Sequence, residues 1–174
     1  MNIERIKKSI RNVPDFPKPG IQFKDITTLL QNLDAYGETI DFFYNTFKNE
    51  NIDVIVGIES RGFIFAAPLS LKLGCKFALA RKPGKLPYNT ISEEYELEYG
   101  TDAIEMHKDA INDDGDRVLI VDDLLATGGT ARAVGKLVNK LKGKIFSYCF
   151  LIYLKELNGL DILLPESVFY LIDY

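Results

Sequence analysis

Short, continuous apolar runs alternate along the chain with longer segments whose apolar residues recur at helical spacing. The runs, which have the length of buried strands, cover residues 53–58, 76–80, 117–121 and 145–154. The segments with helical spacing cover residues 33–49, 62–73 and 130–141. This alternation predicts an α/β fold, because right-handed crossovers build a parallel sheet flanked by helices on both faces. Ligands of such sheets bind beyond the carboxyl ends of the strands.

The amino-terminal part of the chain predicts two helices. Residues 1–13 are amphipathic at helical spacing and charged throughout, which favours a helix packed on the body over a signal peptide. In segment 33–49 we expect Asp34 to be the N-cap. The face that this second helix would bury carries Ile40, Phe43, Tyr44 and Phe47.

One stretch, residues 82–100, does not fit the packed core. It is polar, and proline and glycine interrupt it. Loops longer than about 12–15 residues in a compact domain are usually functional lids or disordered segments. We therefore interpret residues 82–100 as a lid loop. The tyrosines and alternating acids of its second half also fit an exposed β-hairpin, which stays open as an alternative.

The composition favours a single compact domain over residues 1–174, with 47% hydrophobic residues. The 21 basic and 25 acidic residues give a net charge of −4, which argues against a nucleic-acid partner. No apolar run approaches the ~20 residues of a membrane span, so we expect a soluble protein without a membrane partner. Cys75 and Cys149 stand far apart with no Cys-x-x-Cys pair, which favours reduced thiols and a cytoplasmic location.

The strongest chemical signal runs from a predicted strand through Asp122 and Asp123 into a Thr-Gly-Gly-Thr turn and a helix. Glycine lets the turn's backbone approach a ligand, threonine adds hydroxyl donors, and the helix directs its positive end to the same point. These features predict a phosphate monoester site formed by Ala126, Thr127, Gly128, Gly129 and Thr130. The motif of nucleotide P-loops is missing, because Lys136 lies a full turn inside the helix.

Asp122 and Asp123 close the predicted strand, so we expect them at the ligand crevice rather than within the sheet. Their carboxylates can accept hydrogen bonds from ribose hydroxyls or help to hold a hydrated Mg²⁺. The alternative is that Asp123 only caps the turn.

A second turn between a strand and a helix, residues 57–62, carries Ser60 and Arg61. The guanidinium of Arg61 can bind phosphate oxygens in a fork, while Ser60 and the backbone add donors. This turn therefore predicts a second anion site. The alternative is a surface salt bridge between Arg61 and Glu59.

Residues 118–130 resemble the phosphoribosyl pyrophosphate (PRPP) signature of the type I phosphoribosyltransferases. Further blocks resemble the adenine-using members of that family over nearly the entire chain: Asp15–Ile26, Glu59–Phe63, Arg81–Pro87 and Leu97–Gly100. The resemblance implies the type I phosphoribosyltransferase fold, with a flexible lid loop and a small N-terminal hood in which residues 1–33 bind the base. It also implies a homodimer that transfers phosphoribose from PRPP to adenine, releases pyrophosphate and requires Mg²⁺ held mainly through PRPP.

The resemblance also implies roles for the remaining site residues. The turn at Ser60 and Arg61 binds pyrophosphate, with a strained or cis peptide near Glu59–Ser60, and Arg81, Lys82 and Lys85 approach it when the lid closes. Pro83 departs from the arginine that we expect in some relatives, which leaves the roles of Arg81 and Lys85 less defined.

The base site is implied in the same way. Phe23, in a predicted ordered loop, stacks on adenine, and the backbone groups of Gln22 and Lys24 bind the edge of the base. The alternative is that Phe23 only anchors its loop in the core.

Glu98 matches the catalytic glutamate of the family, although spacing alone does not choose between it and the neighbouring acids, Glu93, Glu94 and Glu96. His107, the sole histidine, is interpreted as a surface residue.

Two other functions remain open from the sequence. One is transfer to hypoxanthine, guanine or xanthine, which would be distinguished by contacts that the sequence does not reveal. The other is a non-catalytic regulator that senses PRPP, which the lid, Glu98 and the lack of a basic DNA-reading helix argue against.

Overall fold

The computed structural model describes residues 2–97, 100–112 and 115–174. The chain divides into two compact units, Met1–Thr46 and Phe47–Tyr174. The first unit therefore extends beyond the predicted N-terminal segment 1–33. None of the helices in the described ranges combines the length and the apolar character that a membrane span needs.

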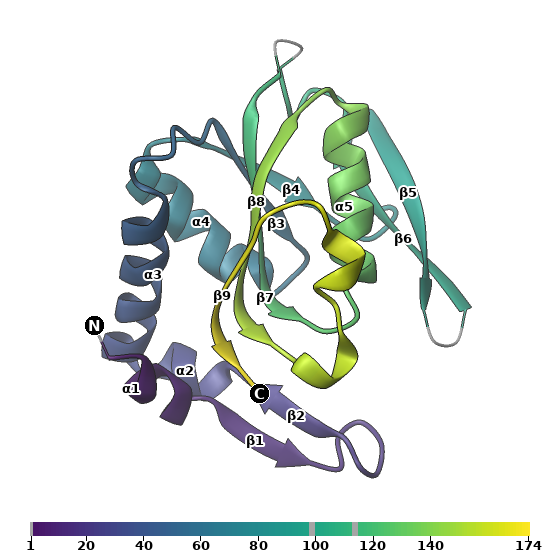
Figure 1. Cartoon of the computed structure of the whole chain (residues 1–174). Coiled ribbons are helices and arrows are strands. Elements are labelled where there is room, and N and C mark those ends of the chain that lie inside the picture. The colour runs from purple at the N-terminus through teal and green to yellow at the C-terminus, as the bar shows by residue number, and fades with distance from the viewer. Residues whose placement is uncertain (1, 98–99, 113–114) are drawn as a thin grey trace. The chain divides into compact units, whose positions relative to one another are not determined.

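The larger unit is built on a parallel sheet, in which the described residues form five strands in the order β4-β3-β7-β8-β9 (Figure 1). The strands are β3 (Val54–Ile58), β4 (Lys76–Ala80), β7 (Arg117–Leu125), β8 (Lys144–Tyr153) and β9 (Val168–Asp173). The first four confirm the predicted apolar runs, and β9 is a strand that the sequence reasoning missed. The predicted parallel sheet flanked by helices is confirmed.

Strand β7 is longer than predicted, and this changes the position of the two aspartates. Its pairing with β3 stops at Val121, but its pairing with β8 continues to Leu125, opposite Tyr153. Asp122 and Asp123 therefore lie within the strand, and the expectation that they close it is wrong. The reason is that β8 extends the ladder past the end of β3.

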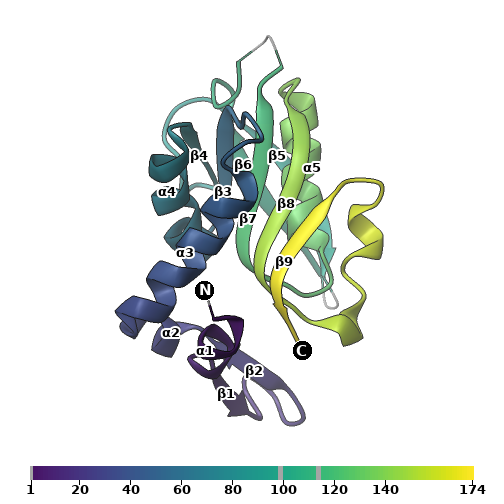
Figure 2. The same ribbon diagram turned by 60° about the vertical axis from the view of Figure 1, so that its left-hand side comes forward.

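Two helices cover opposite faces of this sheet (Figures 1 and 2). Helix α4 (Gly62–Leu73) joins β3 to β4, and helix α5 (Gly129–Lys140) joins β7 to β8, close to the predicted ranges. The two connections leave in opposite directions along the sheet, and crossovers of the same hand then place their helices on opposite faces. The strand order therefore has its switch point between β3 and β7.

The stretch predicted as a lid contains a strand. β5 (Thr90–Leu97) pairs with β6 (Gly100–His107) in an antiparallel hairpin, as the alternative interpretation has it. The hairpin is not wholly exposed, because Ile104 and Met106 are fully buried and belong to the core. Its first strand is also held to α5, where the Nζ atoms of Lys136 and Lys140 lie 2.8 and 2.6 Å from the carboxylate of Glu93.

The smaller unit contains α1 (Ile3–Lys8), β1 (Arg11–Pro14), β2 (Gln22–Asp25), α2 (Thr27–Gln31) and most of α3 (Leu33–Phe47). Strands β1 and β2 pair antiparallel. The helix predicted over residues 1–13 thus ends early, and its second half forms β1. The helix predicted over residues 33–49 is confirmed as α3, with Ile40, Phe43 and Phe47 buried and Tyr44 partly buried.

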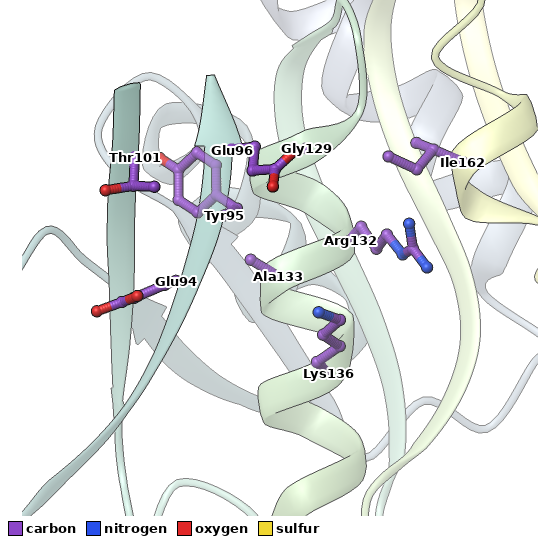
Figure 3. Close-up of a pocket in the computed structure, with 9 residues that line it drawn as sticks. All are labelled: Glu94, Tyr95, Glu96, Thr101, Gly129, Arg132, Ala133, Lys136 and Ile162. Atoms are coloured by element: carbon purple, nitrogen blue, oxygen red, sulfur yellow. The ribbon is translucent and has the colours of Figure 1, made fainter. Parts of the chain in front are cut away.

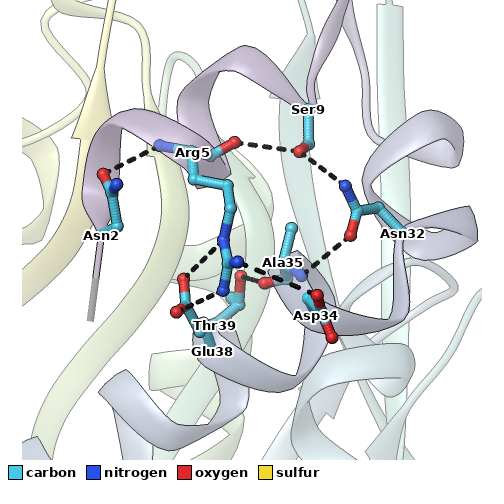
Figure 4. Close-up of polar contacts among 8 residues, drawn as sticks. All are labelled: Asn2, Arg5, Ser9, Asn32, Asp34, Ala35, Glu38 and Thr39. Atoms are coloured by element: carbon cyan, nitrogen blue, oxygen red, sulfur yellow. Dashed lines mark hydrogen bonds and ion pairs between the residues drawn. The ribbon is translucent and has the colours of Figure 1, made fainter.

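The N-cap of α3 is Asn32, and the expectation of Asp34 is wrong (Figure 4). The Ala35 N–H donates to Asn32 Oδ1 at 3.1 Å, which satisfies one of the unpaired amides of the first turn. Asp34 is the second residue of the helix and lies in its first turn, where its carboxylate is 3.8 Å from the guanidinium of Arg5. The same guanidinium forms an ion pair with Glu38, which connects α1 to α3.

Candidate functional site

Two loops meet at the switch point of the sheet. One follows β3 and contains Ser60 and Arg61, and the other follows β7 and contains the Thr-Gly-Gly-Thr turn. Because β3 and β7 are neighbours whose helices leave on opposite faces, these loops flank the crevice in which parallel sheets bind ligands. The pairing of β3 with β7 ends before Asp122, so the aspartates extend past the last paired residue of β3 toward the first loop.

Residues 126–130, predicted to bind phosphate and called here the phosphate turn, line a small pocket of about 90 Å³. Its lining includes Asp122 and the whole predicted turn: Ala126, Thr127, Gly128, Gly129 and Thr130. Gly128 has a φ of +84°, a left-handed conformation that favours glycine, and it is the N-cap of α5. The unpaired N–H groups of the first turn of α5 therefore lie at the pocket, where they suit an anion of phosphate size.

The two aspartates are closely coupled. Asp123 is buried with 3% of its surface exposed, and its N–H donates to Asp122 Oδ1 at 2.8 Å. Burial raises the pKa of Asp122 well above its usual range, and the charge of Asp123 raises it further. Burial also raises the pKa of Asp123, although Arg61 opposes this shift. A site with such pKa values suits a ligand that brings hydroxyl donors or positive charge.

Arg61 is paired with Asp123. Its Nε lies 3.1 Å from Asp123 Oδ2, whereas the carboxylate of Glu59, the partner in the alternative interpretation, pairs with Arg81. The geometry at this contact is that of an ion pair, and Oδ2 has no hydrogen-bond partner among the described residues. A buried carboxylate oxygen without a hydrogen-bond partner is a candidate acceptor for a ligand donor or a hydrated metal ion.

Glu59 instead joins the ends of β3 and β4. Its carboxylate lies 3.1 Å from Arg81 Nε and accepts the Lys82 N–H at 2.8 Å. Burial alone would raise the pKa of Glu59, but the Lys82 N–H and Arg81 outweigh it and lower this pKa. The peptide bond between Glu59 and Ser60 is cis, which confirms that expectation. Sequence reasoning missed the role of Glu59.

The family resemblance implies PRPP as the substrate, and for that substrate we expect the change Glu59→Ala to raise the KM by about tenfold, because a misplaced positioning group commonly costs this much or more. The loss of the carboxylate releases Arg81 and the Lys82 N–H beside the turn that carries Arg61. Steady-state kinetics measure this effect. Glu50→Ala is the matched control, since it breaks the exposed pair of Glu50 with Arg117, 3.6 Å apart. Equal KM values for both variants would contradict the prediction.

Of the other predicted cations, Lys82 has a partner of its own, and Lys85 contacts Arg81 through its backbone. Lys82 Nζ forms an ion pair with Asp102 on β6, and Tyr95 Oη donates to the same carboxylate at 3.3 Å. The carbonyl oxygen of Lys85 accepts a hydrogen bond of 3.1 Å from Arg81 Nη1. The hairpin therefore holds Lys82 through Asp102, a residue that sequence reasoning did not single out.

A larger pocket, of about 400 Å³, lies between the hairpin and α5 (Figure 3). Its lining combines acids and cations: Glu94, Tyr95, Glu96, Thr101, Gly129, Arg132, Ala133, Lys136 and Ile162. The pocket shares Gly129 with the phosphate pocket but does not include the aspartates. Of the neighbouring acids, Glu93 is held by Lys136 and Lys140, which lower its pKa. Glu98, the predicted catalytic residue, lies outside the described residues.

The predicted base-binding residues lie in the smaller unit. Gln22, Phe23 and Lys24 belong to strand β2, and the prediction of an ordered loop is therefore wrong at these positions. The partly buried ring of Phe23 contacts Phe16 edge to face, with centroids 5.1 Å apart. Asn12 binds both flanking side chains, since it accepts from Lys24 Nζ at 3.0 Å and donates to Gln22 Oε1 at 2.6 Å.

Within the described ranges, no group of three or more His, Cys, Asp or Glu side chains is arranged to hold a metal ion. The candidate protein ligands for Mg²⁺ are the carboxylates of Asp122 and Asp123. Their oxygen atoms have the chemistry that Mg²⁺ prefers, and a site with few protein ligands leaves room for water and phosphate oxygens.

Comparisons with known proteins point to one family. The family model for a phosphoribosyl transferase domain matches residues 24–162. The adenine phosphoribosyltransferase of Brachyspira hyodysenteriae is 57% identical over 169 residues, which cover 97% of this chain and 99% of the relative. Adenine phosphoribosyltransferase 1 of Triticum aestivum is 52% identical over 170 residues, 98% of this chain and 93% of the relative.

Solved structures give the same result. The crystal structure of adenine phosphoribosyltransferase from Thermoanaerobacter pseudethanolicus is similar with a TM-score of 0.96 and 49% identity, covering 99% of this chain and 100% of the other. The enzyme from Saccharomyces cerevisiae, complexed with an iminoaltritol bisphosphate and adenine, is similar with a TM-score of 0.92 and 40% identity, covering 98% of each chain.

Proposed function

The chain belongs to the adenine phosphoribosyltransferases, and from this premise we propose how its residues act. The enzyme transfers the 5-phosphoribosyl group of PRPP to adenine and forms AMP and pyrophosphate. The observation that carries the assignment of residues is the pocket formed by Asp122 and the turn 126–130 at the switch point of the sheet.

The sugar phosphate occupies this pocket. Its 5′-phosphate accepts hydrogen bonds from the N–H groups of residues 126–130 and the hydroxyls of Thr127 and Thr130. The ribose hydroxyls donate to Asp122 and Asp123. The raised pKa values of this pair support the proposal, since hydroxyl donors and nearby positive charge both stabilise carboxylates that burial makes costly to ionise.

The pyrophosphate group lies at the first loop, bound by Ser60 and Arg61, with Arg81, Lys82 and Lys85 as further cations. Mg²⁺ held mainly by PRPP, with Asp122 and Asp123 as protein ligands, would neutralise charge on the leaving group. The ion pairs of Arg81 with Glu59 and of Lys82 with Asp102 must loosen or be shared if these two side chains reach pyrophosphate.

Adenine stacks on Phe23, and the backbone of Gln22 and Lys24 binds its edge. The position of these residues in β2 supports this assignment. The sheet has only two strands in the described chain, so one edge of β2 pairs with no other strand and can offer backbone groups to the base. Glu98 acts as the general acid and base at the imidazole part of the purine. Cleavage of the bond from C1 to pyrophosphate leaves positive charge on the sugar, so fixing both phosphate ends and the base in line can lower the barrier by up to ~7–11 kcal/mol.

The test is an assay with adenine, PRPP and Mg²⁺ in which AMP is detected, repeated with hypoxanthine, guanine and xanthine. We expect turnover with adenine and a much lower kcat/KM with the other bases. A preference for another base would reject adenine as the substrate. Binding of PRPP without turnover of any base would favour the regulator that senses PRPP.

We also propose a cytoplasmic homodimer. The outer face of α4 and the edge strand β4 expose apolar side chains, with Leu71 84% and Phe77 37% exposed. The free thiols of Cys75 and Cys149 fit a reducing compartment. Sedimentation is expected to give a dimer for the native chain and a monomer for Leu71→Lys. Leu164→Lys, at another exposed leucine, is the control, and a native monomer would refute the dimer.

A further inference from the structure

The chain returns to the phosphate turn after β8. The short helices η1 (Lys155–Leu157) and η2 (Asp161–Leu163) follow that strand, with Asn158 at a φ of +51° between them. The Leu154 N–H donates to the Leu125 carbonyl at 3.0 Å, which fixes the start of this segment to the end of β7. Residues 158–162, called here the back wall, then lie against the turn.

The contact between the back wall and the turn leaves no room for side chains on two glycines. A Cβ atom on Gly159 would lie 2.1 Å from the carbonyl oxygen of Ala126. A Cβ atom on Gly128 would lie 2.4 Å from Ile162 Cγ2 and 2.7 Å from the Gly159 carbonyl oxygen. Real Cβ contacts essentially never fall below 3.0 Å, so the backbones of Gly159 and Ala126 touch directly.

This contact gives a second reason for a glycine at position 128, in addition to the access that it gives a ligand. The space that its side chain would need is already filled by Gly159 and Ile162. The back wall thus supports the turn from within the protein and fixes where its N–H groups stand.

We propose that the back wall is a positioning element for the sugar phosphate and that Gly159 is its decisive positioning residue. The inference deepens the proposed function and rests on the assignment of the 5′-phosphate to residues 126–130. Gly159 has no contact with the ligand in this proposal. It acts by keeping Ala126 where the turn can bind three phosphate oxygens at once.

The change Gly159→Ala tests this. The added methyl must displace Ala126 or the back wall by about 1 Å, and such a misplacement of a binding group can lower a rate by about 10²-fold. We expect the Kd for ribose 5-phosphate, measured by calorimetry, and the KM for PRPP to rise by at least about tenfold. The KM for adenine is expected to stay within about twofold.

Gly143→Ala is the matched control. Its Cβ atom would lie 2.8 Å from Val138 Cγ1 and 3.0 Å from Ile111 Cδ1, so it overpacks the core of the same unit away from the turn. We expect it to lower the Tm without changing the Kd for ribose 5-phosphate. A merely structural role for Gly159 predicts the same result for both variants, and that result would overturn the inference.

If Gly159→Ala does not fold, Ile162→Ala decides, because it removes atoms from the back wall instead of adding them. We expect a rise of about threefold or more in the Kd for ribose 5-phosphate, whereas an unchanged Kd would overturn the inference. Native protein that makes no AMP would instead reject the proposed function. Calorimetry with ribose 5-phosphate thus separates a failure of the positioning role from a failure of the proposed activity.

Discussion

The change Asp123→Ala is expected to lower kcat/KM for PRPP by about 10³-fold, since hydrogen bonds to a charged group contribute roughly 1.5–3 kcal/mol each and a ribose offers two hydroxyls to the pair. The same change removes the partner of Arg61, whose guanidinium lies 3.1 Å from Asp123. Both effects disturb the sugar and the pyrophosphate ends of PRPP together. Steady-state kinetics at saturating adenine measure the loss.

Folding should suffer less than catalysis. Asp123 is a buried carboxyl whose pKa burial raises, so its ionised form is not a source of stability. We expect Asp123→Asn, which keeps the shape, to fold as well as the native chain while it loses most of the activity. A kcat/KM within about threefold of the native value for both variants would end the assignment of the sugar site.

The neighbouring Asp122 makes the stability of the folded protein depend on pH. Its folded pKa lies above the unfolded value, so folding favours the protonated form. The cost to stability is therefore absent below the unfolded pKa of about 4, and it grows as the pH rises toward the folded pKa. Asp122→Asn, which retains the oxygen that accepts the Asp123 N–H, should match the native Tm at acidic pH and exceed it at neutral pH.

The second large effect concerns Glu98. We expect Glu98→Gln to lower kcat by about 10²–10⁴-fold, the usual contribution of a positioned general acid or base, with a small change in KM for PRPP. The pH profile of kcat should lose the limb that reports this carboxyl. The measurement is kcat against pH for the native chain and the variant.

Glu93→Gln is the control for the same acidic stretch. Glu93 accepts hydrogen bonds from Lys136 and Lys140, which lower its pKa, and these cations are about half exposed. Its loss should cost no more than about 1 kcal/mol of stability and leave kcat near the native value. If Glu94→Gln or Glu96→Gln abolished turnover while Glu98→Gln did not, the catalytic role would move to that residue.

Local sequence patterns predicted the strands and helices that short-range patterns of apolar residues specify. The runs that became β3, β4, β7 and β8 are continuously apolar because both faces of the sheet are covered, and this signal needs no partner to be visible. The helix prediction over residues 1–13 was wrong in its second half for the opposite reason. Residues 11–14 continue a helical pattern, but pairing with residues 22–25 in a hairpin outweighs the local preference.

The contacts of the site also divide into those that consecutive residues make and those that depend on the strand order. The residues of the phosphate turn are consecutive, so their common pocket could be predicted. The partners of Arg61 and Arg81 could not, because each arginine has several acids within reach of its side chain and only the strand order selects one. The alternative pair of Arg61 with Glu59, two residues away, rested on sequence proximity, whereas spatial proximity selects Asp123 as a partner.

By itself, the sequence determined the parallel α/β architecture, the position of the turn proposed to bind phosphate and the family to which the chain is similar, since apolar periodicity, glycine conformation and consecutive donors are properties of short segments. Only the tertiary structure decided that β7 continues past its aspartates, that the hairpin packs on α5, and that Gly159 supports the turn from 33 residues away. These features depend on which backbones touch, and excluded volume between distant segments leaves no periodic trace in the sequence.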